Sequence, residues 1–325
     1  NTAKLVHCVH ADEFATLEEA FAAGTQALDD AEVMLFETPP VAPPDRPHRG
    51  DDPLRVAMTS NMSREQYEDM VRRAKEYICE GDVIQVVLAQ HFTGEIHCDH
   101  LDIYRALRYV NPSPYIFYIK LDEQRAMVGS SPEMMAFFGE GVAQIRPIAG
   151  TRRRGADLQE DEALAKELLA DPKECAEHVM LVDLARNDLG RIATIGSVEV
   201  SEYMKIERYS HVMHIVTQVD AQVRPELDGI DVFKATFPAG TLSGAPKVRA
   251  MEIINELEPD GRGPYGGALG YISYGGKVMD TAITIRTLVF NGNTATVTAG
   301  AGIVYDSEPE REYEETQHKS LGMKR

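Results

Sequence analysis

Acidic side chains recur at helical spacing in two distant parts of this chain. Glu312 and Glu315 are three residues apart and Lys319 follows four residues later, so the three fall on one face of a helix. Glu174 and Glu177 repeat the three-residue spacing in an earlier helical pattern. Mg²⁺ takes oxygen ligands and keeps water molecules that a substrate can replace. The two pairs predict a site for a hard divalent cation, although each pair alone is also typical of a solvated helix face.

The charge balance limits the classes of partner. The 325 residues include 52 acidic and 33 basic side chains, which gives a formal net charge of −19. Nucleic acid and anionic membrane surfaces both require a basic face, so we expect neither as a partner. An anionic substrate would need local positive charge from a metal ion, a few Arg or Lys side chains, or helix N-termini.

Cysteine usage and hydropathy indicate the compartment. The four cysteines (Cys8, Cys79, Cys98 and Cys175) show neither Cys-x-x-Cys spacing nor the density of a disulfide scaffold. No apolar run approaches the roughly 20 residues needed to span a bilayer. We therefore expect a cytoplasmic protein with free thiols.

The chain divides into three regions at a proline-rich stretch. Residues 39–55 are rich in proline and charge and are expected to form a linker or loop between residues 1–38 and residues 56–325. Strand patterns often follow strand patterns directly, which favours an antiparallel or mixed sheet over a βαβ repeat. Predicted strands cover 82–92, 115–121, 134–138, 196–200, 268–274, 281–290 and 294–299, and predicted helices cover 13–30, 63–80, 161–170, 172–188, 230–236, 247–257 and 309 onward.

Two glycine-containing segments suggest nucleotide binding and fail the test. Residues 240–247 lack the adjacent Gly-Lys step followed by Ser or Thr that a phosphate-binding P-loop requires. Residues 300–305 place Tyr305 where the dinucleotide fingerprint needs a small residue. Neither segment predicts a nucleotide site.

Five further segments combine turn residues with reactive side chains in an order that resembles a known family. They are 147–155 (Pro-Ile-Ala-Gly-Thr and an Arg triplet), 209–216, 237–247, 263–271 and 280–287. The set is similar to the chorismate-utilising enzymes, and within them most to the anthranilate synthase component I branch, over residues 60–325. Residues 1–38 look like a remnant of that family's N-terminal domain, most of which is absent. The resemblance implies an α+β fold: an antiparallel β-sheet sandwich with helices on the outside.

The same resemblance implies a ligand set for Mg²⁺ and chorismate. Glu177 and Glu315 would ligate the metal, with Glu174 and Glu312 beside them. The residues expected to hold the substrate are Gly150, Thr151, Tyr265, Arg286, Gly300, Ala301, Gly302 and Lys319. Without the resemblance, Arg286 could equally be an outward strand residue, and Lys319 a cation that complements a helix C-terminus.

Three residues are implied in catalysis and in the choice of nucleophile. His214 would act as general acid, although a histidine among apolar residues is also typical of a protein core, and Thr241 would line the reacting ring. Gln85 stands where water-adding members of the family have a lysine, and a neutral amide cannot serve as a general base. Ala149 stands where many aminodeoxychorismate synthases carry a lysine nucleophile.

The resemblance, with Gln85 and Ala149 at these two positions, implies the amination of chorismate at C2, with loss of the C4 hydroxyl and elimination of pyruvate to give anthranilate for tryptophan biosynthesis. The alternatives are aminodeoxychorismate synthase component I, aminodeoxyisochorismate synthase, and an inactive fragment that only binds a partner.

The family resemblance also implies partners. Ammonia is expected from a separate glutamine amidotransferase subunit. Tryptophan is expected as a feedback inhibitor, and Pro114, Tyr115 and Ile116 resemble one wall of its pocket.

Overall fold

The computed structural model describes residues 4–37, 56–209 and 212–323. The chain separates into two compact units, Asn1–His48 and Arg49–Arg325. The predicted linker at 39–55 lies outside the described residues, so the three-region division remains a prediction.

The first unit is helical in its described part. It contains a 3-10 turn, η1 (Ala11–Glu13), and helix α1 (Leu17–Glu37). The helix predicted at 13–30 thus begins and ends later than expected. Residues 4–16 are irregular apart from η1.

The second unit contains two seven-stranded sheets in which every described pairing is antiparallel. Sheet A has the order β1 (Thr59–Ser60), β2 (Gln85–Glu95), β14 (Thr294–Ile303), β13 (Thr287–Asn291), β4 (Arg125–Ser131) and β3 (Tyr115–Lys120), with β10 (Gly244–Ala245) also paired to β2. Sheet B has the order β11 (Ala268–Ile272), β12 (Met279–Ile283), β5 (Met134–Gly139), β6 (Val142–Ile145), β9 (Val212–Gln222) and β7 (Ile148–Arg153), with β8 (Glu199–Arg208) also paired to β9.

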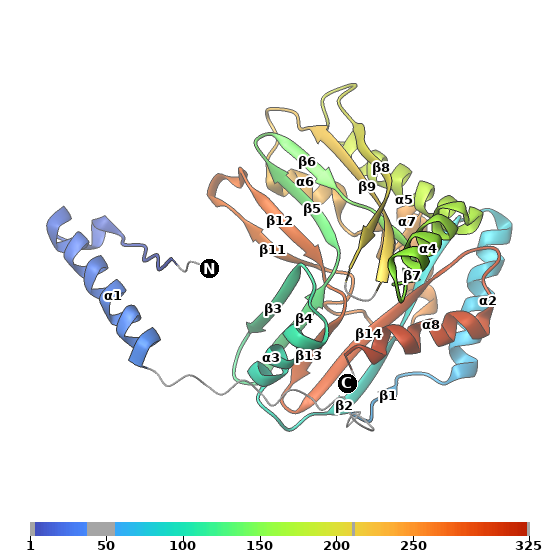
Figure 1. Cartoon of the computed structure of the whole chain (residues 1–325), viewed down its shortest axis with the longest axis horizontal. Helices are drawn as coiled ribbons and strands as arrows, with labels where there is room; N and C mark the ends of the chain where they lie inside the picture. Colours follow the sequence, from blue (N-terminus) through green and yellow to red (C-terminus); the bar gives the residue numbers. More distant parts are fainter. Residues whose placement is uncertain (1–3, 38–55, 210–211, 324–325) are drawn as a thin grey trace. The chain divides into compact units, whose positions relative to one another are not determined.

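Helices cover the outer faces of both sheets (Figure 1). On sheet A, α2 and α8 pack together, α8 and α7 contact β14 and β2, and α3 contacts β4 and β3. On sheet B, α4 and α5 contact β7 and β9, and α6 contacts β5. The helices are α2 (Arg64–Glu80), α3 (His100–Val110), α4 (Leu158–Ala170), α5 (Pro172–Gly190), α6 (Gly229–Thr236), α7 (Lys247–Leu257) and α8 (Pro309–Leu321), with short 3-10 turns η2 (Gly240–Leu242) and η3 (Tyr274–Gly276). The α+β sandwich expected from the sequence is confirmed.

Separate hydrophobic clusters anchor these helices. One joins α5 and α6 to sheet B through residues such as Val182, Leu189 and Val232. Another joins α2 and α7 to β2 and β14, and its fully buried members include Tyr67 and Ile253. Because apolar burial holds each helix to one sheet, the side chains at helix ends are fixed relative to that sheet.

Local sequence explains where the two carboxylate-bearing helices begin. Asp171 is the N-cap of α5, and its side chain accepts hydrogen bonds from the backbone amides of Lys173 and Glu174. Pro172 at the first turn has the backbone angle that a helix start needs. Helix α8 also has a proline, Pro309, in its first turn, but its N-cap residue Glu308 forms no side-chain capping hydrogen bond.

The structure corrects one predicted element. The predicted strand 281–290 is two strands, β12 and β13, which belong to different sheets. Arg286 lies in the break with a φ of +49°, a left-handed conformation that interrupts the extended backbone. Arg286 belongs to neither strand, although its carbonyl oxygen accepts a hydrogen bond from the backbone amide of Ser130 in β4 at 3.1 Å. In the part of the chain that the structure describes, no helix is long and apolar enough to cross a membrane.

Candidate active site

A cavity of about 650 Å³, here called the central cavity, lies between the two sheets. Its lining includes Gln85, Gly300 and Gly302 from sheet A, together with Gly150 and His214 from sheet B. This size suits a small organic ligand. It receives fifteen of the predicted site residues: His214, Thr241, Gln85, Gly150, Thr151, Tyr265, Arg286, Gly300, Gly302, Lys319, Glu174, Glu177, Glu312, Glu315 and Pro114.

Three predicted residues do not line the central cavity. The side chain of Ala301 is buried in the cluster with α2 and α7, on the opposite face of β14, so only its backbone could serve a ligand. Tyr115 donates a hydrogen bond to Asp280 Oδ1 at 3.0 Å, and Ile116 follows it on β3. Only Pro114 of the predicted tryptophan wall reaches the cavity, and the regulatory role of these three residues remains a prediction.

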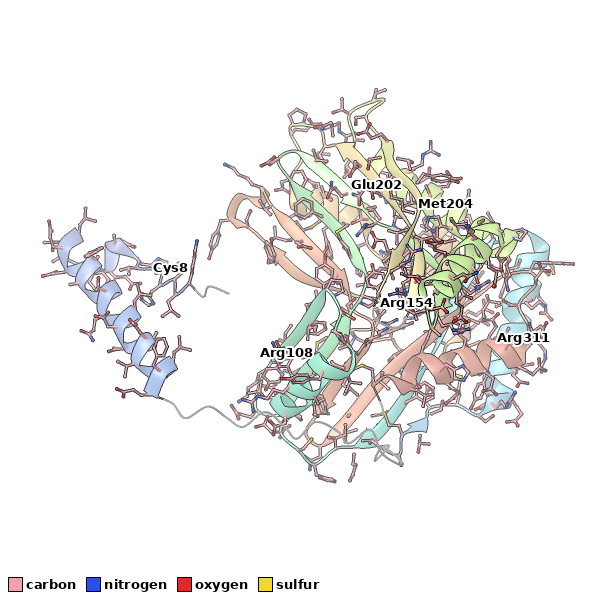
Figure 2. All side chains as sticks on the ribbon, viewed as in Figure 1. Cys8, Arg108, Arg154, Glu202, Met204 and Arg311 are labelled. Atoms are coloured by element: carbon pink, nitrogen blue, oxygen red, sulfur yellow. The ribbon has the colours of Figure 1, made fainter. Side chains whose placement is uncertain are left out.

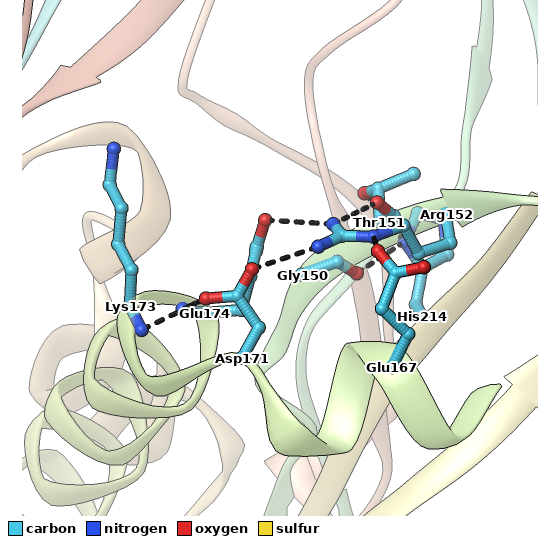
Figure 3. Close-up of polar contacts among 8 residues, drawn as sticks. All are labelled: Gly150, Thr151, Arg152, Glu167, Asp171, Lys173, Glu174 and His214. Carbon is cyan, nitrogen blue, oxygen red and sulfur yellow. Dashed lines mark hydrogen bonds and ion pairs between the residues drawn. The ribbon is translucent and has the colours of Figure 1, made fainter. Parts of the chain in front are cut away.

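Glu174, at the start of α5, is held by a neighbouring arginine (Figure 3). Arg152, on β7, donates to Glu174 Oε1 at 3.1 Å, to Asp171 Oδ2 at 2.8 Å and to Glu167 Oε1 at 3.1 Å. One guanidinium therefore connects β7 to the end of α4 and the start of α5. Arg154, labelled in Figure 2, directly follows β7. It donates to Oδ1 of the buried Asp161 at 2.7 Å and to its Oδ2 at 3.1 Å, which connects this end of β7 to α4.

The carboxylates of α5 and α8 interact across the cavity. Burial raises the pKa of Glu177, and the charges of Glu174 and Glu315 raise it further. Burial and the charge of Glu315 also raise the pKa of Glu312, against a hydrogen bond from Ser307. Mutual repulsion of this kind disfavours the ionised carboxylates until a cation approaches.

This donor set fits Mg²⁺. All four groups supply carboxylate oxygens, and the two helices bring them to one cavity from separate sheets. Among the described residues no group of three or more His, Cys, Asp or Glu side chains is close enough to enclose a metal ion. Mg²⁺ is usually bound by one or two carboxylates plus substrate oxygens and water, so a protein cage is not required.

Three cationic side chains, Lys173, Lys319 and Arg286, line the same cavity. Lys319 Nζ donates to Glu315 Oε1 at 2.7 Å and to the carbonyl oxygen of Gly300 at 3.0 Å. Arg286 projects into the cavity, and within the described ranges no side chain forms a hydrogen bond or ion pair with its guanidinium. Its pKa is lowered by burial, which is opposed by the charge of Glu133. An unpaired guanidinium in a cavity is suited to a carboxylate ligand.

Gly300 and Gly302 are glycines because neighbouring groups leave no room for a Cβ atom. A Cβ at Gly302 would lie 2.5 Å from Gln85 Nε2, and one at Gly300 would lie 2.8 Å from the Tyr265 hydroxyl and 2.9 Å from the Leu88 carbonyl oxygen. The two positions therefore keep the cavity floor open beside the backbone of β14.

His214 is tied to the segment that carries the predicted Gly-Thr step (Figure 3). Its Nδ1 lies 3.1 Å from the carbonyl oxygen of Gly150 and 3.0 Å from Thr151 Oγ1. Since a carbonyl only accepts, Nδ1 carries the proton and Nε2 is the free nitrogen of a neutral ring. Burial lowers the pKa of His214, which favours the neutral imidazole over the imidazolium that a general acid requires.

Gln85 has an unsatisfied acceptor. Its side chain is 3% exposed, and its Oε1 has no hydrogen-bond partner among the residues that the structure describes. A buried amide oxygen without a donor is costly, and in a binding cavity it indicates a ligand N–H or O–H.

Glu133 is a site residue that the sequence analysis missed. It lies between β4 and β5, lines the central cavity, and accepts a hydrogen bond from Thr241 Oγ1 at 3.0 Å. Burial raises its pKa to about 7, while Thr241, Lys319 and Arg286 act in the opposite direction. One signal could have found it, because Glu133 is the single charged residue in 126–139, an otherwise apolar and small-residue stretch.

Comparison with known proteins identifies the family. The chain matches the family of chorismate binding enzymes over residues 2–325. The chain belongs to this family. The fold described above is shared with this family.

Several relatives at about 50% identity are named anthranilate synthase component 1. The chain is 56% identical over 264 residues to an anthranilate synthase component 1 of Aquifex aeolicus, covering 81% of this chain and 53% of the relative. It is 50% identical over 320 residues to that of Acinetobacter calcoaceticus, covering 97% and 62%. A solved anthranilate synthase component I from Streptococcus pneumoniae superposes with a TM-score of 0.82 at 41% identity, covering 95% of this chain and 67% of that chain. The chain spans about half the length of the curated relatives it matches.

Proposed function

We propose that this chain is the chorismate-binding catalytic part of an anthranilate synthase component 1. In the reaction, chorismate and ammonia give anthranilate, pyruvate and water. Nitrogen forms a bond to C2, the C4 hydroxyl leaves with a proton as water, and the enolpyruvyl group leaves as pyruvate. The observation that carries the proposal is the central cavity itself, in which carboxylates, three cations and an unsatisfied amide oxygen converge.

Cationic side chains and the glycine backbone of β14 would bind the substrate. Chorismate carries two carboxylates, and Arg286 offers an unpaired guanidinium inside the cavity. Lys319 is available at the cost of its contact with Glu315. The backbone of Gly300 and Gly302 can approach a flat ring closely because no side chain intervenes.

Glu177 and Glu315 would hold Mg²⁺, with Glu174 and Glu312 next to them. When bound, Mg²⁺ supplies positive charge to the ring carboxylate and to the charge that develops during departure of the hydroxyl. Arg152 would keep Glu174 in place at the start of α5.

Two residues are candidates for the acid that protonates the departing C4 hydroxyl. A carboxyl group with a pKa of about 7 is protonated for part of the population at neutral pH and can give up its proton readily, which favours Glu133. Thr241 would orient it through the 3.0 Å hydrogen bond. His214, the sequence-based hypothesis, would have to act against its lowered pKa.

Gln85 would select the nucleophile. Its free Oε1 can accept a hydrogen bond from ammonia, whose lone pair then points away toward the ring. Because a neutral amide cannot remove a proton from water, isochorismate formation is disfavoured. Ammonia needs no deprotonation before it attacks.

The partners follow from the chemistry. We propose that a glutamine amidotransferase subunit supplies ammonia and that tryptophan is a feedback inhibitor bound near Pro114. The name component 1, borne by the relatives, supports a partner component. The four free cysteines, three of them exposed, support a reducing, cytoplasmic location.

The test is a product assay with chorismate, Mg²⁺ and excess ammonium at mildly alkaline pH. Anthranilate and pyruvate should appear in equal amounts, and Glu315→Ala should lower turnover by more than about a hundredfold because a direct metal ligand is lost. Glu314→Ala is the matched control, since Glu314 is the adjacent residue of α8 and pairs with Arg64 outside the cavity. Accumulation of aminodeoxychorismate without pyruvate would contradict the proposal in favour of the aminodeoxychorismate alternative. A folded protein that turns nothing over would support an inactive fragment.

A further inference from the structure

Helix α5 is tied to sheet B by a polar contact inside an apolar interface. His178 directly follows the predicted metal ligand Glu177, and its Nε2 lies 2.6 Å from Oγ1 of Thr217 on β9. His178 and Thr217 are both fully buried. The side chains that flank the pair are apolar and belong to two hydrophobic clusters: Cys175 and Val182 on α5, Ile215 and Val219 on β9. This hydrogen bond therefore joins helix and strand between the two clusters.

Thr217 is held on its other side by an irregularity of sheet B. Its Oγ1 accepts a hydrogen bond from the backbone amide of Met204 at 3.0 Å, so its own proton is available to Nε2 of His178. Met204, labelled in Figure 2, has a φ of +49° and lies where the pairing of β8 with β9 shifts register, between Glu202 and Lys205. Nδ1 of His178 has no partner among the described residues, so the ring is oriented by Thr217.

Helix α8 is tied to sheet A in the same way. Thr316 directly follows the predicted ligand Glu315, and its Oγ1 accepts a hydrogen bond from Nε2 of Gln90 on β2 at 2.6 Å. Gln90 and Thr316 are both fully buried. Oε1 of Gln90 accepts a hydrogen bond from Ser60 on β1 at 2.6 Å, so both ends of the amide are satisfied. The side chains that flank the pair are again apolar: Leu88 and Phe92 on β2, Tyr313 on α8 and Met323 just beyond it.

Buried polar pairs of this kind restrict position more than they add stability. Folding exchanges their hydrogen bonds to water for one internal hydrogen bond, and an apolar pair of the same shape can be as stable. Apolar contacts change little when a helix slides slightly along a sheet, whereas a hydrogen bond weakens steeply outside a narrow range of distance and angle. In both helices the polar residue directly follows the predicted metal ligand, so the position that it fixes is that of the carboxylate.

We propose that the pairs His178–Thr217 and Gln90–Thr316 are positioning residues for the metal site, which fix Glu177 relative to sheet B and Glu315 relative to sheet A. The inference rests on the proposed function, which assigns Mg²⁺ to these carboxylates. None of the four paired side chains lines the central cavity, so they act through the helices that they join to the sheets. Because α5 and α8 pack on different sheets, one pair is needed on each.

Deleting one hydroxyl from each pair tests the proposal. Thr217→Val and Thr316→Val keep the shape of the side chain and remove the hydrogen bond, and serine at either position restores the hydroxyl. Thr281→Val is the matched control, because Thr281 is buried in β12, lies outside the central cavity and donates to the carbonyl oxygen of Ala136 at 2.9 Å. Mg²⁺ affinity is measured by calorimetry with chorismate present and ammonium absent, and Tm by scanning calorimetry.

We expect Thr217→Val and Thr316→Val each to raise the Mg²⁺ Kd about tenfold or more, as the loss of groups that orient metal ligands does. Thr217→Ser and Thr316→Ser should stay near wild type. Thr281→Val should lose a similar Tm and keep the wild-type Kd. A Kd that rises no more in the two test variants than in this control would overturn the proposal.

A double variant separates position from stability. In His178→Leu/Thr217→Val both members of the pair are apolar, so no polar side chain is left unpaired and Tm should return toward that of wild type. The Mg²⁺ Kd should stay raised, because an apolar contact does not fix α5 along β9. Recovery of both Tm and Kd would mean that the pair only stabilises the fold, and would overturn the proposal.

A crystal structure of the same double variant without ligands gives a readout that depends neither on Mg²⁺ nor on turnover. After superposition of sheet B on a wild-type crystal structure, the Cα atom of Glu177 should be displaced by more than about 0.5 Å, the tolerance within which binding groups must be held. An unmoved α5 would overturn the positioning role. If wild type binds no Mg²⁺ and forms no anthranilate from ammonium, the proposed function fails, and the displacement of α5 still decides whether the pair positions this helix.

Discussion

At the scale of single residues, burial determines which groups can exchange protons at neutral pH. Glu133 and His214 line one cavity, and the same loss of solvent moves their pKa values in opposite directions. Burial disfavours the charged form of each, so the carboxylic acid gains protons and the imidazole loses them. The better proton donor of the pair at neutral pH is therefore Glu133.

We expect kcat for wild type to fall as the pH rises through about 7, because the protonated form of Glu133 is lost there. Glu133→Gln should lower kcat by roughly 10²–10⁴ at pH 6.5 and remove that dependence. If His214 is the acid, the fall should instead begin below its ordinary pKa of 6.5, and His214→Gln should flatten the profile. Rates at saturating chorismate and ammonia between pH 5.5 and 9 distinguish the two.

The same pKa has a consequence for stability that can be measured without substrate. An unfolded Glu133 ionises near 4.5 and the folded one near 7, so wild-type stability is lost as the pH rises through this interval. At pH 8, Glu133→Gln should be more stable than wild type by up to about 3 kcal/mol in urea unfolding, and the difference should vanish below about pH 4.5. Glu162→Gln, at an exposed position of α4, should show no such difference.

At the scale of elements, the carboxylates are positioned by the start of one helix and the body of another. Asp171 caps α5 and also accepts from Arg152, so a single side chain fixes the helix start and the arginine that holds Glu174. Helix α8 is fixed by its packing on β14 and α2. The predicted metal site is thus shared by two independently anchored helices.

Asp171→Ala should lower the free energy of unfolding by about 1 kcal/mol through loss of the cap and should also weaken Mg²⁺ binding. Asp157 caps α4, which carries none of the predicted ligands, so Asp157→Ala is the matched control. It should lose a similar stability and keep its Mg²⁺ affinity. Calorimetry with Mg²⁺ in the presence of chorismate measures the difference, and equal affinities would refute a positioning role for Asp171.

Helices were easier to predict from the sequence than strands. Helix α2 has a Ser63–Gln66 capping box and a regular apolar stripe, and its predicted range, 63–80, agrees with Arg64–Glu80. The helix at His100–Val110 and the strands β4, β6, β7 and β9 were not predicted. The identity of such strands depends on partners far away in sequence, which a local pattern does not contain. Arg286 shows the same limit. Its left-handed backbone divides the predicted strand 281–290 between two sheets, and the apolar residues around it give no sign of this conformation.

The candidate site was predictable where motifs carried it and not where three-dimensional burial did. The family motifs brought fifteen predicted residues to one cavity. Glu133 owes its role to desolvation and to Thr241, and Ala301 was assigned to the site although its side chain points into the core. The burial of Glu133 and the direction of the Ala301 side chain both depend on which face of each strand points to the cavity. That orientation is fixed only when the two sheets are assembled.

At the scale of the whole molecule, two sheets with separate cores meet at the central cavity, in a chain of net charge −19. A ligand held between α5 and α8 contacts both halves, so it can only bind when both are folded. Binding of this kind adds to the stability of the native state.

With Mg²⁺ and chorismate each at about a hundred times its Kd, the free energy of unfolding should rise by about 2.7 kcal/mol per ligand, and Tm by several degrees. Glu315→Gln should remove the Mg²⁺-dependent part and leave the Tm of the ligand-free protein nearly unchanged. Scanning calorimetry measures both. A Mg²⁺ response that survives in Glu177→Gln and Glu315→Gln alike would place the metal elsewhere.

The position of β14 has a consequence for how the protein is made. This strand pairs with β2 over ten residues across a separation of roughly two hundred residues, and it lies inside sheet A rather than at its edge. A ribosome therefore releases β2 long before its neighbour exists, with apolar residues such as Val86 and Leu88 still without their native cover. Long-range pairing of this type slows folding and prolongs the exposure of unpaired strand edges, which are prone to aggregation. The nascent chain should accordingly depend on chaperones until its last strand enters the middle of the sheet, and overproduction that outruns them should favour inclusion bodies.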